Sequence, residues 1–353
     1  ETILSSALRM LKQSGKIDEL PNTAQYQGKR YSFSRKADDI IKMGGITVDW
    51  KRMPEEFFKS GVVPMQASYG CPYSCAFCNF MKDRRLMGVK PLDDLLEELK
   101  VVEERGARYV WFVDDNFRLG KNDLETVCKR FLDQGIKVKW KSFIRASALK
   151  DMDLRLLKAA GCIEVQFGLE SADPTLLARM NKKANPELYS KVIKKVMKAG
   201  INCSCYFIFG FPGETEETIM RTRDFIKGLE HPTLDGYIYF TMFPFIIAPL
   251  SPISEPKNAI PYGLKGHMYD WEHNTMNSKE AKEHATKALF ELETSGIIYH
   301  GDNLDKLLSM DPRQRKEFIA KRHKMAKMAA AGQITKEDLI REFKEVLQEP
   351  VTP

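Results

Sequence analysis

The sequence predicts an α/β protein, a partial (β/α)6 barrel followed by a helical C-terminal extension. Three observations support this. Between residues 62 and 250, six apolar runs alternate with amphipathic helical segments. Some runs, such as residues 109–113, are continuously apolar, as strands covered on both faces are. Beyond residue 256 the pattern becomes a loop and then helices, so the two further units that a closed eight-unit barrel needs are not predicted.

Each unit of the barrel has its own signals in the sequence. The predicted strands are residues 62–67, 109–113, 138–144, 163–169, 201–209 and 237–245. Helices follow the first five, from about residues 91, 124, 153, 185 and 215, and the first four of them end at Gly106, Gly135, Gly161 and Gly200. Because strands joined through helices form right-handed parallel units, we expect all six strands in one parallel sheet.

The segments on either side of the barrel predict a division into residues 1–61, 62–250 and 251–353. The chain opens with apolar residues at helical spacing and with no capping residue before them: Ile3, Leu4, Ala7, Leu8 and Leu11. A connector without periodicity follows from residue 21 to residue 58. We therefore expect the first part to be the tail of an upstream domain and a linker, and the last part to be a loop and then helices.

The composition excludes several classes of protein. Of the 353 residues, 43% are hydrophobic and 29% charged, as in ordinary globular proteins, and no apolar run is long enough to span a membrane. The net charge of +7 is too small for the basic surface of a nucleic-acid-binding protein. Seven cysteines are too few for a disulfide framework in a chain of this length. We expect a cytoplasmic protein with no membrane span and no nucleic-acid partner.

Three of the cysteines lie in a short loop after the first predicted strand. Cys71, Cys75 and Cys78 have the spacing Cys-x3-Cys-x2-Cys. Structural zinc sites usually use four protein ligands in paired Cys-x2-Cys knuckles, and the sequence contains no second knuckle or Cys/His pair downstream to complete one. Three thiolates can instead hold a [4Fe–4S] cluster and leave one iron open to an outside ligand. The loop therefore predicts a cluster that acts on a small molecule, in preference to a zinc site or three unrelated core cysteines.

This spacing is the signature of the radical S-adenosylmethionine (SAM) enzymes, which the chain resembles. Phe77 is the aromatic residue commonly found just before the last cysteine in that family. The resemblance implies a TIM-like partial barrel, a [4Fe–4S] cluster on the three cysteines, SAM, and an electron donor such as flavodoxin or ferredoxin. The N-terminal helix and linker more loosely resemble those of the cobalamin-binding members, which implies cobalamin as a further cofactor.

Polar residues follow the predicted second and third strands, where parallel barrels carry their functional residues. The second strand ends in Asp114, Asp115 and Asn116, at the position of the family's second SAM-contacting motif. These three could instead cap the following helix. Arg145 ends the third strand, where its guanidinium could bind the SAM carboxylate or form a salt bridge at the barrel rim.

The fourth and fifth strand ends extend this set. Gln166 and Glu170 lie in the segment Gln-Phe-Gly-Leu-Glu-Ser, which resembles the family's fourth-strand motif. By that resemblance, Glu170 accepts hydrogen bonds from the ribose hydroxyls or the amino group of SAM. The fifth strand ends in Gly210, Phe211, Pro212 and Gly213, where the two glycines would let the backbone approach the adenine.

The sequence identifies no catalytic side chain. Candidates are Cys205 in the fifth strand, and Tyr262 and His267 in a loop that could close over a substrate. A buried free cysteine is usually a core residue. Tyr262 and His267 are equally compatible with surface packing.

Together, the residues and the resemblance predict an enzyme that cleaves SAM to methionine and a 5′-deoxyadenosyl radical. The expected reaction is cobalamin-dependent methylation of an unactivated carbon in a small-molecule or peptide substrate. The alternatives are a cobalamin-class cyclase or oxidoreductase, a tRNA methylthiotransferase-like enzyme, and a zinc-stabilised binding protein. Because cobalamin is expected on an upstream domain, this chain alone is expected to keep the cluster and SAM sites but to transfer no methyl group.

Overall fold

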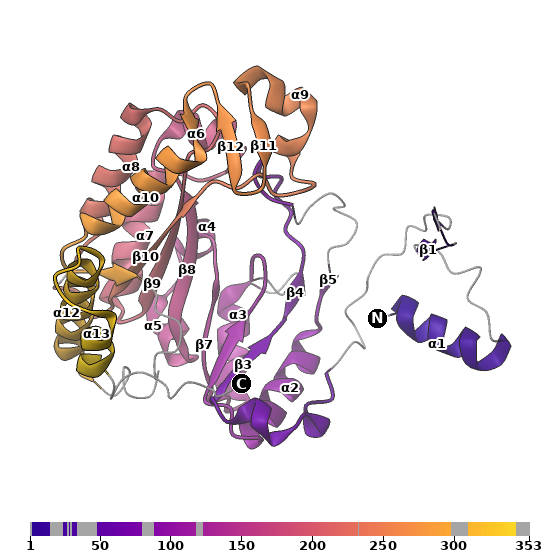
Figure 1. Cartoon of the computed structure of the whole chain (residues 1–353). Coiled ribbons are helices and arrows are strands. Elements are labelled where there is room, and N and C mark those ends of the chain that lie inside the picture. Colours follow the sequence, from indigo (N-terminus) through magenta and orange to yellow (C-terminus); the bar gives the residue numbers. More distant parts are fainter. Residues whose placement is uncertain are drawn as a thin grey trace. The chain divides into compact units, whose positions relative to one another are not determined.

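The structure is a computed structural model that describes residues 2–14, 24–26, 28, 30–33, 48–79, 88–117, 123–231, 233–297 and 310–343. The chain divides into two compact units, Glu1–Ile41 and Lys42–Pro353 (Figure 1). The first unit contains α1 (Thr2–Ser14), which confirms the predicted opening helix, and an antiparallel pair, β1 (Ala24–Tyr26) and β2 (Tyr31–Phe33).

A parallel sheet forms the centre of the second unit (Figure 1). Its strands, in spatial order, are β14 (Gly296–Ile297), β10 (Ile238–Pro244), β9 (Asn202–Phe209), β8 (Cys162–Glu170), β7 (Lys139–Phe143), β6 (Tyr109–Phe112) and β3 (Val62–Met65). All six predicted strands are confirmed, each within two residues at either end. In the described part of the chain no pairing joins β3 to β14, so the sheet is open, as in a partial barrel.

Helices in the connections between strands pack against one face of this sheet. They are α2 (Leu92–Glu104), α3 (Leu124–Asp133), α4 (Ala146–Leu149), α5 (Leu154–Ala159), α6 (Pro174–Arg179), α7 (Pro186–Lys198), α8 (Glu216–Gly228) and α10 (Ser278–Phe290). The side chains of Asp123, Asn185 and Thr215 each accept a hydrogen bond from a backbone amide in the first turn of the helix that follows them. The sequence does not predict α6, nor α4, whose four residues are too few to show a helical period.

The two faces of the sheet have different surroundings. On the outer face, Trp140 packs on Phe131 of α3, Phe167 on Tyr189 of α7 and Phe207 on Phe225 of α8. All three strand aromatics have exposed fractions of 0%. Alternate residues point to the opposite, inner face. That face is only partly covered, since Trp111 and Phe243 keep exposed fractions of 37% and 48%.

The region after residue 250 differs from the prediction. A loop was expected before α10, but the segment forms η4 (Pro252–Ser254), α9 (Pro256–Ala259), η5 (Ile260–Tyr262) and an antiparallel sheet of β11 (Lys265–His267), β12 (Asp270–His273) and β13 (Met276–Asn277). β14 is a further strand that the sequence does not predict. All of these strands have four residues or fewer, too few for an apolar alternation to be recognised in the sequence, and all residues of β11 are exposed.

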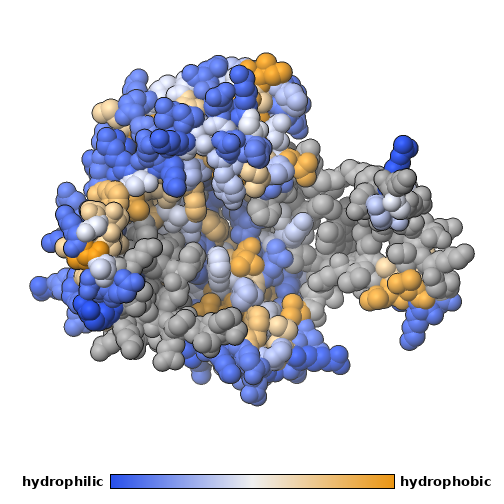
Figure 2. Space-filling model, in the orientation of Figure 1, coloured by the Kyte–Doolittle hydropathy of each residue, from blue (hydrophilic) through white to orange (hydrophobic). Residues whose placement is uncertain are grey.

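The expected helices of this region are present. They are α10, α12 (Pro312–Ala330) and α13 (Lys336–Phe343). Figure 2 shows many hydrophilic residues on this side of the molecule, with apolar residues in smaller patches. Among the described residues, no helix is long and apolar enough to cross a membrane.

Part of the predicted linker packs onto the barrel. Trp50 begins the short helix η1 (Trp50–Arg52), and its indole Nε1 donates a hydrogen bond of 3.0 Å to Glu98 Oε2 in α2. Lys90 Nζ lies 2.7 Å from Glu98 Oε1, with both side chains at most 5% exposed. This buried triad connects the linker, α2 and the segment that returns from the cysteine loop.

Candidate active site

The cysteine loop leaves the sheet at the C-terminal end of its first strand. β4 (Ser68–Tyr69) precedes the loop and pairs with β5 (Gly88–Val89). Cys75 is buried, whereas Cys71 and Cys78 are half-buried. Burial raises the pKa of the Cys75 thiol, although the Lys182 ammonium acts in the opposite direction. The three thiols thus lie at the sheet edge where parallel α/β folds place their active sites.

Two carboxylates from the end of β6 hold the start of this loop. Asp114 Oδ1 accepts hydrogen bonds from the backbone amide of Ser68 and, at 2.5 Å, from its hydroxyl. Asp115 Oδ2 accepts one from the Gly70 amide at 3.2 Å. Burial raises the pKa of Asp114 to about 6, and the hydrogen bonds from Ser68 oppose this rise. Both side chains border the cavity described below, and both position the loop.

The middle of the loop is held from the other side by the residues after α6. Asn181 Nδ2 donates hydrogen bonds to the carbonyl oxygen of Ser74 at 2.8 Å and to its hydroxyl at 3.0 Å. The amide of Ala76 donates to the Met180 carbonyl at 2.7 Å. The sequence does not reveal this anchor, because no local pattern connects residues 107 positions apart.

A cavity of about 430 Å³ borders the three cysteines. Its lining contains site residues that the sequence predicts at four strand ends, together with residues that the sequence did not identify. The predicted ones are Phe77, Asp114, Asp115, Asn116, Arg145, Gln166 and Glu170, and the others include Tyr73, Trp111, Phe143, Lys182 and Tyr189. The volume is in the range usual for small-molecule sites.

A buried ion pair lies in this cavity. Lys182 Nζ is 2.7 Å from Glu170 Oε1, and each side chain is 11% exposed. Burial, the largest single cause, lowers the pKa of Lys182, but the interactions with Glu170, Tyr189 and Cys75 together outweigh it, and the pKa is raised. Glu170 has a φ of 68°, where β8 is irregular, and left-handed backbone is costly for a residue with a side chain. The ion pair and the strand irregularity together set the direction of this carboxylate.

Two further predicted residues are engaged by neighbours. The Arg145 guanidinium carbon lies 3.8 Å from the centre of the Tyr73 ring, and its Nη2 donates to the Lys183 carbonyl. Gln166 Oε1 accepts a hydrogen bond from Trp111 Nε1 at 3.1 Å, and its Nε2 donates to the Tyr206 hydroxyl at 3.0 Å. Arg145 therefore brings a second cation to the cavity, and Gln166 aligns two aromatic rings.

The fifth strand end lies outside the lining of this cavity. A side chain at Gly210, which has a φ of 88°, would collide with Ala281 and Trp271, so glycine here permits close packing of the loop on α10 and β12. Gly213 has a φ of 87°, and Phe211 packs on Phe245 at 5.3 Å between ring centres. Pro212 lies between them in the same turn.

The three candidate catalytic residues are also absent from the lining. Cys205 is fully buried on the same face of β9 as Phe207, toward the helices, and burial raises its pKa well above the usual value. Tyr262 ends η5 close to Gly213, and His267 is exposed in β11. None of these three residues, and no residue of the fifth strand end, therefore borders the cavity beside the cysteines.

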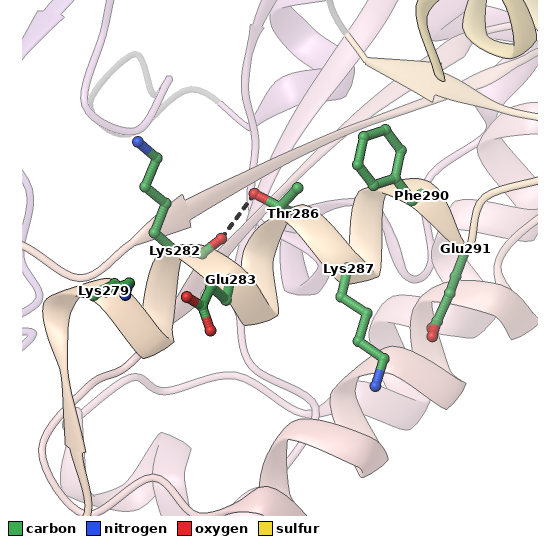
Figure 3. A pocket seen from close by; sticks show the side chains of 7 residues that line it. All are labelled: Lys279, Lys282, Glu283, Thr286, Lys287, Phe290 and Glu291. Carbon is green, nitrogen blue, oxygen red and sulfur yellow. Dashed lines mark hydrogen bonds between the residues drawn. The ribbon is translucent and has the colours of Figure 1, made fainter. Parts of the chain in front are cut away.

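A separate hollow of about 570 Å³ lies along the surface of α10 (Figure 3). Its lining includes Lys279, Lys282, Glu283 and Phe290, which come from successive turns of that one helix. No cysteine and no strand end contributes to it. We therefore place the candidate chemistry in the cavity beside the cysteine loop.

Comparison with known proteins agrees with this placement. Residues 65–226 match the radical SAM superfamily. A methyltransferase of Pyrococcus horikoshii, itself described as uncharacterized, is 30% identical over 184 residues, which are 50% of this chain and 40% of that protein. The chain therefore spans less than half the length of this relative.

Two solved structures share the fold. TsrM of Kitasatospora setae, a radical SAM methyltransferase, has a TM-score of 0.62 at 17% identity, covering 72% of this chain and 51% of that chain. Another structure of TsrM contains cobalamin and a [4Fe–4S] cluster. OxsB, a cobalamin-dependent SAM radical enzyme, has a TM-score of 0.60 at 16% identity, covering 99% of this chain and 59% of that chain. The match of residues 65–226, which contain the cysteine loop and the residues that line its cavity, identifies this part of the chain as a radical SAM domain.

Proposed function

We propose that this chain is the catalytic part of a cobalamin-dependent radical SAM methyltransferase. The observation that carries the proposal is that three loop cysteines and side chains from the ends of β6, β7 and β8 border one cavity of about 430 Å³. Three thiolates fit a [4Fe–4S] cluster with one open iron. When bound, such a cluster supplies the electron that cleaves SAM.

The arrangement of the cysteines is compatible with a cluster. Among the described residues, no three His, Cys, Asp or Glu side chains converge closely enough to hold a single metal ion. A cluster does not require that convergence, because each cysteine binds a different iron. Asp114, Asp115 and Asn181 would hold the loop in place around it through the hydrogen bonds described above.

The remaining side chains of the cavity suit SAM. The cations Lys182 and Arg145 would attract the carboxylate of its methionine part. Glu170 would accept hydrogen bonds from its amino group or ribose hydroxyls, as the sequence predicts. The rings of Tyr73 and Phe77 border the same space and would exclude water from it. In this proposal the protein binds, orients and shields the cofactor.

Cobalamin and methyl transfer are supported by the methyltransferase relative and by the two solved structures of like fold. The substrate would be a small molecule or a peptide, and the electron donor a flavodoxin or ferredoxin. In this proposal the chain divides into residues 1–61, 62–250 and 251–353, as the sequence predicts.

The test is anaerobic reconstitution of the chain with iron and sulfide, followed by reduction in the presence of SAM labelled in its methyl group. We expect about four irons per chain and release of 5′-deoxyadenosine. Stoichiometric zinc without iron would overturn the proposal and favour a zinc-stabilised binding protein. A cyclised or oxidised product without label would leave the radical chemistry intact but exclude methylation.

A further inference from the structure

Aromatic side chains cluster on the inner face of the sheet. Trp111 of β6, Phe143 of β7, Tyr206 of β9 and Phe243 of β10 are here called the aromatic wall. Strand pairing places them on one face. Trp111 is paired with Lys141, two residues before Phe143, and Tyr206 is paired with Thr241, two residues before Phe243. Gln166 of β8 connects the two pairs, because it is paired with Phe143 and with Ser204, two residues before Tyr206. Exposed fractions of 37% for Trp111 and 48% for Phe243 leave the wall open to a ligand.

The rings of the wall are held in fixed orientations. Phe143 and Tyr206 have ring centres 5.1 Å apart, and Tyr206 and Phe243 are 6.3 Å apart and nearly parallel, with 5° between their planes. The amide of Gln166 connects Trp111 and Tyr206 by hydrogen bonds of 3.1 and 3.0 Å. A set of rigid, partly exposed rings is suited to stacking on a flat ligand.

The wall is continuous with the candidate active site. Trp111, Phe143 and Gln166 line the cavity that borders the cluster cysteines. A molecule lying on the wall would therefore be adjacent to the proposed SAM site, where a substrate of the radical must lie.

A cation accompanies the wall. Lys141 lies on the inner face of β7, with Nζ 5.1 Å from the centre of the Trp111 ring. The neighbouring carboxylate, Glu164, accepts a hydrogen bond of 2.8 Å from the Ser204 hydroxyl. Within the described part of the chain, no carboxylate lies within ion-pair distance of the Lys141 ammonium. The ammonium is therefore placed to meet an anionic group on a molecule stacked against Trp111.

From these observations we propose that the aromatic wall binds the substrate, and that the substrate is a flat conjugated molecule with a carboxylate directed toward Lys141. This inference rests on the proposed radical SAM function and adds the chemical class of the substrate. The rings would bind the conjugated plane, and the lysine would select the end that carries the acid.

The test uses the anaerobically reconstituted chain and three small probes, measured by equilibrium dialysis. They are 2-naphthoate, the neutral 2-naphthylmethanol and the non-aromatic cyclohexanecarboxylate. We expect 2-naphthoate to bind most tightly. Phe243→Ala should weaken both naphthyl probes about tenfold through loss of a stacking face. Lys141→Gln should weaken 2-naphthoate about tenfold and leave 2-naphthylmethanol unchanged.

Two variants outside the wall serve as controls. Phe290→Ala removes a ring of similar exposure, 40%, and Lys279→Gln removes a lysine; both residues belong to α10. Neither should change the binding of any probe. SAM binding, measured in parallel, should be the same in all four variants. Equal binding of 2-naphthoate and cyclohexanecarboxylate, or probe binding insensitive to Phe243→Ala, would overturn the inference.

The parallel SAM measurement separates the two proposals. If SAM binds and no naphthyl probe does, the aromatic wall is not a substrate site and the radical SAM function stands. If SAM does not bind, the proposed function fails, and the inference that depends on it fails too. If cobalamin binds to the chain and Phe243→Ala abolishes this binding while 2-naphthoate does not compete, the wall is a cofactor surface and the inference is wrong.

Discussion

Single side chains decide which charges face the proposed SAM site. Lys182 forms a close ion pair with Glu170 and lies 5.8 Å from the centre of the Phe77 ring. Its neighbour Lys183 has the same side chain but is exposed, whereas Lys182 lines the cavity. They form a matched pair for testing the cavity.

Lys182→Met is expected to weaken SAM binding. A charge-assisted hydrogen bond contributes about 1.5–3 kcal/mol, which corresponds to an affinity about 10- to 100-fold lower when it is lost. Equilibrium dialysis of labelled SAM measures the effect, with iron content determined on the same samples. Lys183→Met should leave SAM affinity unchanged. Equal losses in both variants would indicate a general electrostatic effect and contradict the assignment.

Replacing any of Cys71, Cys75 or Cys78 by alanine is expected to abolish the cluster and SAM cleavage, because a cubane needs all three thiolates. Cys128→Ala and Cys162→Ala serve as controls, since these cysteines are buried in α3 and at the start of β8. Visible absorption and iron analysis report the outcome. Retention of full iron content in a loop-cysteine variant would contradict the proposed ligands.

The carboxyl group of Glu214 is expected to make the stability of the folded chain fall as the pH rises. Its side chain is fully buried, and burial raises its pKa from 4.5 to about 8, although the amides of Gly210 and Phe211 oppose this rise. The folded state therefore binds a proton that the unfolded state releases above pH 4.5. This contribution to stability is complete at low pH and is lost as the pH rises toward about 8.

We therefore expect the wild-type unfolding temperature to fall between about pH 5 and about pH 8 more than that of Glu214→Gln, which has no proton to lose. Thermal unfolding followed by circular dichroism measures both profiles. Parallel profiles for the two proteins would mean that Glu214 has an ordinary pKa.

At the level of secondary-structure elements, the Trp50–Glu98–Lys90 triad joins three segments that are separate in sequence. Glu98→Ala leaves the Lys90 ammonium buried and unpaired, which costs about 3–5 kcal/mol. Urea unfolding should show this loss, whereas Glu97→Ala, at an exposed position of the same helix, should change stability by less than about 0.5 kcal/mol. A loss below about 1 kcal/mol for Glu98→Ala would contradict a buried, paired role.

The secondary-structure elements differ in whether the sequence predicts them. Strands β7 to β10 and helices α2, α3 and α7 are long enough to show apolar patterns and end signals, so the sequence predicts them. β6 has only four residues, but it is predicted because its segment is continuously apolar. Strands β11 to β14 have two to four residues each and are stabilised by their neighbours, so their own residues carry no comparable signal.

For the whole molecule, the length of its relatives gives the remaining prediction. The chain spans 40% of the methyltransferase relative and 59% of OxsB. We expect residues 1–353 to cleave SAM under reducing conditions but, without added cobalamin, to transfer no methyl group, because the proposed methylation depends on cobalamin. Mass spectrometry for 5′-deoxyadenosine and for labelled product, with and without added methylcobalamin, provides the test. Methyl transfer by this chain without cobalamin would exclude the cobalamin-dependent assignment.

The sequence by itself determined the cysteine loop, the six main strands and the polar residues at their ends. These features are local, since ligand spacing, apolar periodicity and strand ends can each be recognised within about ten consecutive residues. The period of two also places Cys205 and Phe207 on one face of their strand, but it does not indicate which face.

Only the tertiary structure decided which of these residues meet. It brought Lys182 and Asn181 to the cysteine loop, engaged Asp114 and Asp115 with loop amides, and placed Cys205 on the helix side of the sheet. The physical reason is that hydrogen bonds and ion pairs between distant segments depend on how helices pack across the sheet. That packing is a property of the whole fold, and no short segment of sequence specifies it.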